Sequence, residues 1–306
     1  MQSQTQKTAN HTIIGSLMVL VAAVALSSKA IIVKLAYVYS VDASTLIALR
    51  MAFSAPFFIG LALWAHTSPA TLKISKHDGW MLVLFGVLGG YGPMLLDFAG
   101  LAYVTAGLER VILFLYPAIV IMLSAILFKH RISQHEWFAL VITYVGVALV
   151  VWHDLSLAKS GSADTLLGAA LVLASAITYA AYLVYSGWAI PRIGSTSFTA
   201  YSMLAAAMAS GVHYASTAHT TAILHLPVQV YWLSLLMAVV ATVLPAILLN
   251  AGIQRIGSNK SSLISSIGPV STILLAYIFL GEHITWLQLG GTGLVLLGVL
   301  AISMKR

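Results

Sequence analysis

The sequence predicts an all-α integral membrane protein of ten transmembrane helices, arranged as two inverted five-helix repeats. Three observations support this fold class: an extreme composition, ten apolar segments of membrane-spanning length, and self-similarity at an offset of 152 residues. Of 306 residues, 60% are hydrophobic and 8% are charged, whereas about a quarter of the residues in soluble domains are charged. This composition excludes a conventional soluble enzyme, a disordered chain and a nucleic-acid-binding module.

Ten apolar runs of about 20 residues, each long enough to cross the hydrocarbon core as a helix, are separated by short polar turns. No run alternates like a barrel strand, and bilayers accept only helices or closed barrels. The expected helices are 13–37, 45–66, 80–101, 105–128, 136–152, 166–188, 198–216, 231–252, 261–280 and 286–304. The first resembles a signal peptide, but apolar residues resume after Lys29, so we expect a retained helix.

The net charge of +7 indicates topology rather than an anionic partner. Basic residues are scattered singly and form no Lys/Arg-rich face, so no nucleic-acid partner is expected. Ten of the fifteen basic residues lie on the side of the termini, and Lys159 lies on the opposite side. Because basic loops stay on the cytoplasmic side, we expect both termini on the cytoplasmic side of a bacterial inner membrane. The remaining four, Lys29, Lys34, Arg50 and Arg110, lie within or at the ends of helices near the outer side.

The chain repeats itself at an offset of 152 residues. The shift pairs Trp80 with Trp232, Pro93 with Pro245, Gly100 with Gly252, Pro117 with Pro269, Ile132 with Ile284 and Gly146 with Gly298. An odd number of helices per half inverts the second half, and basic residues switch between equivalent turns as inversion requires. We therefore expect a cytoplasmic tail at 1–11, repeats at 12–153 and 165–304, and a periplasmic linker at 154–164.

Several motifs carry a family resemblance. They are Ile47-Ala48-Leu49-Arg50-Met51, Tyr116-Pro117, Gly268-Pro269 and Leu280-Gly281-Glu282-His283-Ile284. With the repeat and topology, the sequence resembles the EamA-type ten-helix carriers of the drug/metabolite transporter superfamily, and among them the YddG-type exporters of aromatic and other neutral amino acids. The family often has the Leu-Gly-Glu turn in both halves, whereas the first copy here reads Phe128-Lys129-His130.

Lys29 is the most informative charge. It lies about 12 Å from the end of its helix, deeper than a lysine side chain comfortably reaches, and intramembrane charges generally face a cavity or a partner. It would bind a substrate carboxylate, or pair structurally with Asp97 or Glu109. Asp97 is expected at shallow depth, as a structural charge. Arg50 is expected to tie its helix to neighbouring carbonyls or to a carboxylate.

Glycines and prolines interrupt corresponding helices in the two halves. Gly90, Gly92 and Pro93 lie in the middle of one helix, and Pro245 occupies the same depth in the inverted half. Such interruptions can unwind and expose backbone groups to a ligand, or they can be packing kinks. With Pro117 and Pro269, they are the predicted hinge or gating residues.

Four tyrosines are expected deep in the membrane: Tyr91, Tyr116, Tyr179 and Tyr182. Tyr179 and Tyr182 share one helix face, where they would provide a stacking wall and hydrogen bonds, although ordinary interhelical contacts would also account for them. Asn250 is a further candidate for substrate binding. His213, His219 and His225 are expected in or near a solvated outer loop, without metal-ligand spacing.

The function expected is therefore that of an inner-membrane secondary transporter working by alternating access. Its substrate is an aromatic or other neutral amino acid, or alternatively a nucleoside, sugar derivative or drug-like compound. No glutamate occurs in the first helix, which favours export driven by the substrate gradient without an obligatory proton. A membrane-embedded enzyme would need clustered His, Asp or Glu residues. No catalytic residue, metal or cofactor is expected, and the protein would be a monomer or weak homodimer in the lipid bilayer.

Overall fold

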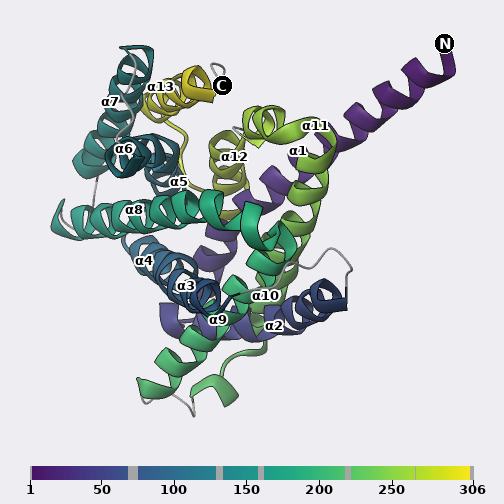
Figure 1. Ribbon diagram of the computed structural model, residues 1–306. Coiled ribbons are helices and arrows are strands. Elements are labelled where there is room, and N and C mark those ends of the chain that lie inside the picture. The colour runs from purple at the N-terminus through teal and green to yellow at the C-terminus, as the bar shows by residue number, and fades with distance from the viewer. Residues whose placement is uncertain are drawn as a thin grey trace.

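The computed structural model describes residues 2–67, 75–128, 134–157, 162–217, 222–265 and 267–303, and these ranges contain helices and no strand (Figure 1). The α-helices are α1 (Gln2–Tyr37), α2 (Ala43–Thr67), α3 (Lys76–Gly86), α4 (Gly92–Leu101), α5 (Ala106–Leu113), α6 (Tyr116–Phe128), α7 (Gln134–Leu157), α8 (Ser162–Ile193), α9 (Ser195–Ser216), α10 (Val228–Ala238), α11 (Leu244–Ser265), α12 (Gly268–Leu280) and α13 (Trp286–Ser303). Two π-helical turns, η1 (Val87–Tyr91) and η3 (Val239–Val243), and a 3₁₀ turn, η2 (Ala222–Leu224), complete them.

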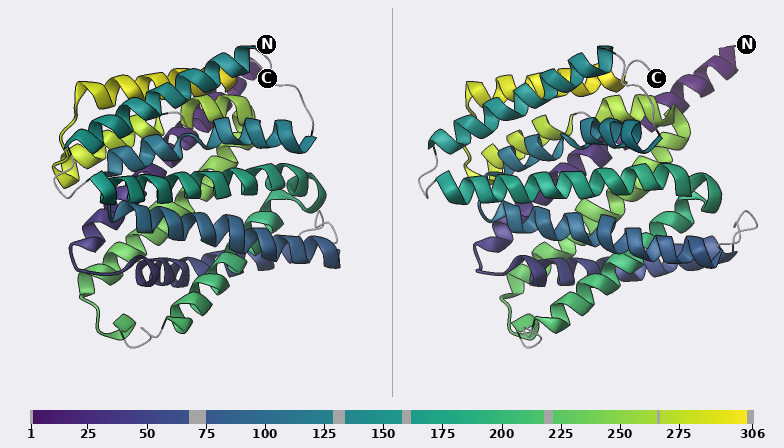
Figure 2. Two further views of the ribbon diagram at one scale, coloured as in Figure 1. Left: turned by 90° about the vertical axis from the view of Figure 1, so that its left-hand side faces the viewer. Right: turned by 60° about the vertical axis from the view of Figure 1, so that its left-hand side comes forward.

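The helices run broadly side by side, and the two chain ends lie towards the same end of the bundle (Figure 2). Six described segments are long and apolar enough to cross a membrane: Thr12–Tyr37, Ala43–Ala65, Lys76–Leu101, Ala106–Leu127, Ala163–Ile190 and Val228–Leu249. Three shorter apolar helices accompany them: Leu140–Trp152, Gly268–Leu280 and Trp286–Gly298. Large apolar side chains such as Leu63, Ile126 and Leu297 are exposed on the bundle, as expected of a lipid-facing surface.

Both π-helical turns precede a proline, and they start 152 residues apart, at Val87 and Val239. A proline ring clashes with the carbonyl four residues earlier and provides no N–H donor, so the α-helical ladder is disrupted ahead of Pro93 and Pro245. The chain instead bonds five residues back, from the N–H of Gly92 to the carbonyl of Val87. The same bond recurs at η3.

The helices that carry Pro117 and Pro269 are broken at corresponding places. The break after α5 lies at Phe114 and Leu115, and Ser265 ends α11 shortly before Gly268 begins α12. In both breaks a tighter bond forms, from Leu115 N–H to Ile112 O (3.0 Å) and from Ile267 N–H to Ile264 O (3.2 Å). The expected turn between 252 and 261 is wrong, because α11 continues to Ser265 and the next helix, α12, begins at Gly268.

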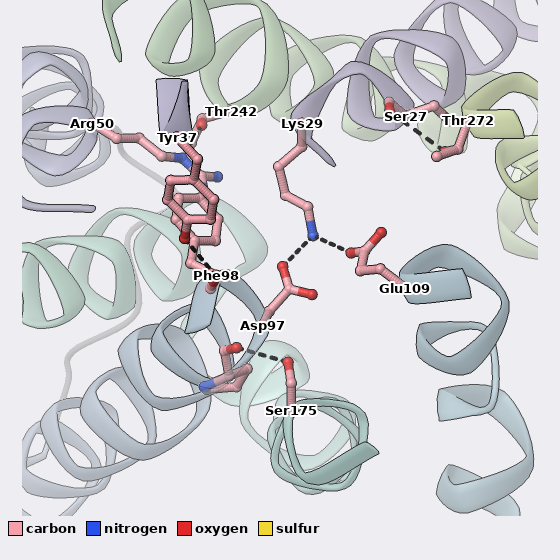
Figure 3. A network of polar contacts seen from close by, with 11 residues as sticks. Ser27, Lys29, Tyr37, Arg50, Asp97, Phe98, Glu109, Ser175, Thr242 and Thr272 are labelled. Atoms are coloured by element: carbon pink, nitrogen blue, oxygen red, sulfur yellow. Dashed lines mark hydrogen bonds and ion pairs between the residues drawn. The ribbon is translucent and has the colours of Figure 1, made fainter. Parts of the chain in front are cut away.

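The first helix of each half packs on helices of the other half. Helix α1 packs against α11 and α12, and α8 packs against α4 and α6. Glycine makes both main crossings close, because a Cβ on Gly100 would lie 2.6 Å from Val172 Cγ2 and one on Gly252 would lie 2.4 Å from Val19 Cγ2. With this exchange of partners, α1, α4 and α5 meet around Lys29, Asp97 and Glu109 (Figure 3).

Candidate functional site

Lys29 lies between two carboxylates from different helices (Figure 3). Its Nζ is 2.5 Å from Asp97 Oδ2 on α4 and 2.9 Å from Glu109 Oε1 on α5. The three side chains are 15%, 5% and 0% exposed. Asp97, expected at shallow depth, is buried in the bundle, and Glu109 is buried more completely. Of the two alternatives for Lys29, the geometry favours pairing with these carboxylates.

The ion triad of Lys29, Asp97 and Glu109 is incompletely satisfied within the described part of the chain. Asp97 Oδ1 and Glu109 Oε2 are buried and accept no hydrogen bond from a described group. A buried carboxylate oxygen without a donor is costly, so the two oxygens can accept from a ligand that enters the site. The triad holds one cation and two carboxylates and therefore has a surplus of negative charge when both acids are ionised.

Arg50 joins α2 to the other half of the chain. Its Nε donates to Thr242 Oγ1 in η3 (2.9 Å), and its guanidinium lies 5.5 Å from the centre of the Phe98 ring. Thr242 in turn donates to the carbonyl of Met237, five residues earlier, within the π-helical turn. Arg50 thus contacts a hydroxyl and an aromatic ring, and it lies within electrostatic range of the Asp97 carboxylate.

Serine and threonine hydroxyls connect the helices around the ion triad (Figure 3). Ser27 on α1 donates to the carbonyl of Gly268 (3.0 Å), where α12 begins, and Thr272 lies 3.4 Å from the carbonyl of Ser27. Ser175 on α8 donates to the carbonyl of Pro93 (2.7 Å). These bonds satisfy backbone groups beside the proline interruptions of both halves.

Three of the four predicted tyrosines gather in one cluster. The rings of Tyr116 and Tyr179 are 5.3 Å apart in a T-shaped arrangement, and Tyr179 is stacked with Tyr182 at 6.2 Å. Tyr182 Oη is 3.0 Å from Ser202 Oγ. Tyr91 lies apart from this cluster, because its hydroxyl pairs with Nδ1 of His213. His213 lies in the last turn of α9, next to the loop near which it was expected.

Tyr179 faces the inside of the bundle. Leu166, Leu173, Ile177 and Trp188 are exposed at helical spacing and mark the outward face of α8. Tyr179 follows Ile177 by two residues, about 200° around the helix axis, yet 37% of its surface is accessible. That face is directed towards Tyr116 of α6, so the accessible part of the ring lies on the side of α8 that packs in the bundle.

Arg110 is a central residue that the sequence reasoning placed only near the outer side, without a role. It follows Glu109 on α5, lies within electrostatic range of Lys29, Tyr116 and Tyr179, and contacts the start of α12 at Gly268. Pro117 was the available signal in the sequence, because a proline there predicts that the helix segment before it borders a discontinuity.

The predicted hinge residues lie at helix irregularities. Gly90 belongs to η1, Gly92 and Pro93 begin α4, Pro245 is the second residue of α11, and Pro117 and Pro269 are the second residues of α6 and α12. Asn250 lies on α11, but its side chain falls outside the described residues.

An apolar groove of about 710 Å³ lies elsewhere, between α2, α3 and α9, lined by residues that include Met51, Ile59, Leu82 and Met208. It contains none of the ion-triad residues and none of the clustered tyrosines. Its apolar lining suits hydrocarbon better than a polar metabolite, so the charged centre is the better candidate site.

Comparisons with known proteins identify a transporter family. The sequence profile of the EamA-like transporter family matches residues 13–152 and again 166–304. The uncharacterized transporter YcbK of Bacillus subtilis is 30% identical over 100% of this chain and 98% of its own length. The uncharacterized inner membrane transporter YicL of Salmonella typhimurium is 26% identical over 95% of each chain.

Two further similarities concern shorter or more distant matches. A protein named probable terminal-alkyne amino-acid exporter, from Streptantibioticus cattleyicolor, is 38% identical over 58 residues, 19% of this chain and 20% of its own. A crystal structure with 19% identity matches 97% of this chain and 99% of that one with a TM-score of 0.62, which shows a shared fold.

Proposed function

The chain belongs to the EamA-like transporter family, and we propose that it is an inner-membrane secondary transporter that exports aromatic and other neutral amino acids. The observation that carries this proposal is the juxtaposition of buried charges with an inward-facing tyrosine cluster where the two halves meet. Charged groups bind an amino-acid head group, and aromatic rings stack on a large side chain. The partial similarity to a named amino-acid exporter and the name of the Salmonella relative are consistent with it.

We propose ten membrane crossings in two inverted halves, 12–153 and 165–304, joined by a periplasmic linker, with the tail at 1–11 and both termini in the cytoplasm. The six long apolar segments, the three shorter ones and α9 would supply the crossings. The recurrence of the π-helical turn and the helix break at an offset of 152 residues supports the repeat. The exchange of packing partners by α1 and α8 supports inversion.

Alternating access would use the interrupted helices as moving parts. The turns η1 and η3 and the breaks before Tyr116 and Gly268 lack a regular α-helical ladder, so they can bend at lower cost than the intact helices around them. Rearrangement at these points would open the tyrosine cluster and the ion triad to each side of the membrane in turn. We regard the protein as a monomer or weak homodimer.

Uptake into proteoliposomes tests the proposal. The radiolabelled panel contains tryptophan, phenylalanine, methionine, threonine and a nucleoside, because a nucleobase would also stack on tyrosine and a nucleoside is the alternative substrate. We expect transport of tryptophan and phenylalanine. Transport of the nucleoside alone would overturn the amino-acid assignment and keep the transporter class.

A second arm of the same assay tests energy coupling. We expect facilitated transport that proceeds without an imposed pH gradient. The structure gives this arm particular weight, because Asp97 and Glu109 provide two buried carboxylates that could hold a proton. Strict dependence of uptake on the gradient would overturn facilitated transport in favour of proton coupling.

A further inference from the structure

Among the residues that the structure describes, Arg110 is a buried-site cation with no acidic ion-pair partner. Both nearby carboxylates, of Asp97 and Glu109, pair with Lys29, and within the described part of the chain Arg110 forms no ion pair. Its Nε is buried and has no hydrogen-bond partner among the described groups. A charge inside a membrane protein is costly unless it faces a partner or a polar cavity, so this guanidinium requires an anion or a cavity that admits one.

The surroundings of Arg110 increase its need for an anion. The guanidinium lies 5.8 Å from the centre of the Phe114 ring, and a Cβ on Gly268 would lie 2.6 Å from its Nη2. Gly268 is the first residue of α12, and the N-terminal end of a helix is itself partially positive. Lys29 and Glu109, which carry opposite charges, both lie within electrostatic range of Arg110, so the positive end of α12 at Gly268 is the part of its surroundings that favours a negative group.

Two rings of the tyrosine cluster lie near the guanidinium. Arg110 is within electrostatic range of Tyr116 and Tyr179, and the accessible part of Tyr179 faces into the bundle. A ligand stacked on these rings would therefore bring its polar group near Arg110. The guanidinium presents parallel N–H donors that match the two oxygens of a carboxylate.

We propose that Arg110 binds the carboxylate of the transported substrate, while Lys29 is the internal counter-ion of Asp97 and Glu109. This inference rests on the proposed transport function and deepens it, because it selects substrates that carry a carboxylate. Asp97 Oδ1 and Glu109 Oε2, which have no hydrogen-bond partner among the described groups, would accept an ammonium group. The preferred substrate is therefore a zwitterion with a large side chain.

Two measurements on the purified full chain test the proposal: ligand-induced thermal stabilisation in detergent and uptake in proteoliposomes. The probes are L-phenylalanine, 3-phenylpropionate, which lacks the ammonium group, and L-phenylalaninamide, which lacks the carboxylate. The variant is Arg110→Gln, with Arg110→Lys as a second variant that keeps the charge and loses the planar fork. The matched control is Arg192→Gln, which removes a half-exposed arginine at the end of α8.

The wild type is expected to bind both carboxylates and to bind the amide at least tenfold more weakly. Arg110→Gln should raise the Kd for the carboxylates about 10- to 100-fold, as expected for loss of a charge-assisted hydrogen bond, and leave the amide unchanged. For Arg110→Lys, the Kd for the carboxylates should lie between those of the wild type and Arg110→Gln. This variant also tests the proposal if Arg110→Gln does not fold. Arg192→Gln should behave as the wild type.

The outcomes separate this inference from the proposed function. Amino-acid transport with unchanged carboxylate affinity in Arg110→Gln and Arg110→Lys would overturn the role of Arg110 and leave the transport function standing. Equal binding of L-phenylalaninamide and L-phenylalanine by the wild type would also overturn the role of Arg110. Arg110-dependent binding of 3-phenylpropionate without amino-acid transport would overturn the function and keep the carboxylate site. If no carboxylate probe binds or is transported, both fail.

Discussion

Glu282 Oε1 accepts a hydrogen bond of 3.0 Å from the backbone N–H of Ala106, and Oε2 accepts one of 3.4 Å from Gly107. The first N–H groups of a helix have no intrahelical acceptor, so this carboxylate from the turn between α12 and α13 caps α5 of the other half. The Leu-Gly-Glu turn of the family resemblance therefore has a structural use here.

Glu282→Ala is expected to lower the free energy of unfolding by about 1 to 2 kcal/mol, the usual cost of losing a helix cap. Glu282→Gln should lose less, because its amide oxygen still accepts one of the two bonds. Unfolding in detergent measures both effects, and amide hydrogen exchange at Ala106 and Gly107 localises them. Wild-type stability of the Ala variant would contradict the cap.

Replacement of Lys29 by Met should destabilise the protein strongly. It leaves Asp97 and Glu109 buried without a counter-ion, a change that typically costs about 3 to 5 kcal/mol. Combining it with Asp97→Asn and Glu109→Gln removes all three charges and should recover most of the loss. The comparison is made by unfolding in detergent, and a triple variant no more stable than Lys29→Met would argue against an internal ion triad.

Alanine at Gly100 should push α4 away from α8, and alanine at Gly252 should push α11 away from α1. The added Cβ would overlap Val172 in the first case and Val19 in the second, so we expect each variant to lose about 1 to 3 kcal/mol. Gly60→Ala is the matched control, since a Cβ there meets nothing within 4 Å and removes only backbone freedom. Equal melting temperatures for the control and both crossing variants would exclude close packing at these glycines.

Tyr179→Ala should raise the KM for tryptophan about 3- to 10-fold, the range expected when one aromatic contact is lost. Tyr179→Phe keeps the ring and should retain most of the affinity. Tyr277→Ala provides a control at an exposed tyrosine on α12. Proteoliposome uptake of tryptophan and threonine distinguishes a stacking role, because only tryptophan transport should weaken.

Asp42 should make stability depend on pH through the start of α2. It accepts a hydrogen bond of 3.1 Å from the N–H of Thr45, and desolvation, which raises its pKa, is outweighed by hydrogen bonds from Ser44 and Thr45 that lower it. A lowered pKa means that the stabilisation is present above the ordinary carboxyl pKa and is lost as the pH falls through the folded-state value. Asp42→Ala should cost about 1 kcal/mol at neutral pH. The difference from the wild type should shrink below about pH 4, as unfolding in detergent across pH would show.

Local chemistry was sufficient to predict much of the helix architecture. Apolar runs of membrane-spanning length predict helices because the bilayer leaves backbone groups no other partner. Pro93 and Pro245 predict irregular turns because the clash and the missing donor act within four residues of the ring. The same reasoning holds for the breaks ahead of Pro117 and Pro269.

The partners of the polar side chains were decided only by the tertiary structure. In a chain that is apolar on nearly every face, residues facing lipid and residues facing other helices are alike, so no periodicity shows which side of a helix is inside. Packing of distant segments therefore determined that Lys29 pairs with Asp97 and Glu109. It also determined that the Tyr91 hydroxyl contacts His213, apart from the other tyrosines. Arg110 has no acidic partner among the described residues for the same reason. The sequence by itself determined where the chain forms apolar helices and where prolines interrupt them, because those effects are local, whereas the charged centre exists only once the helices have packed.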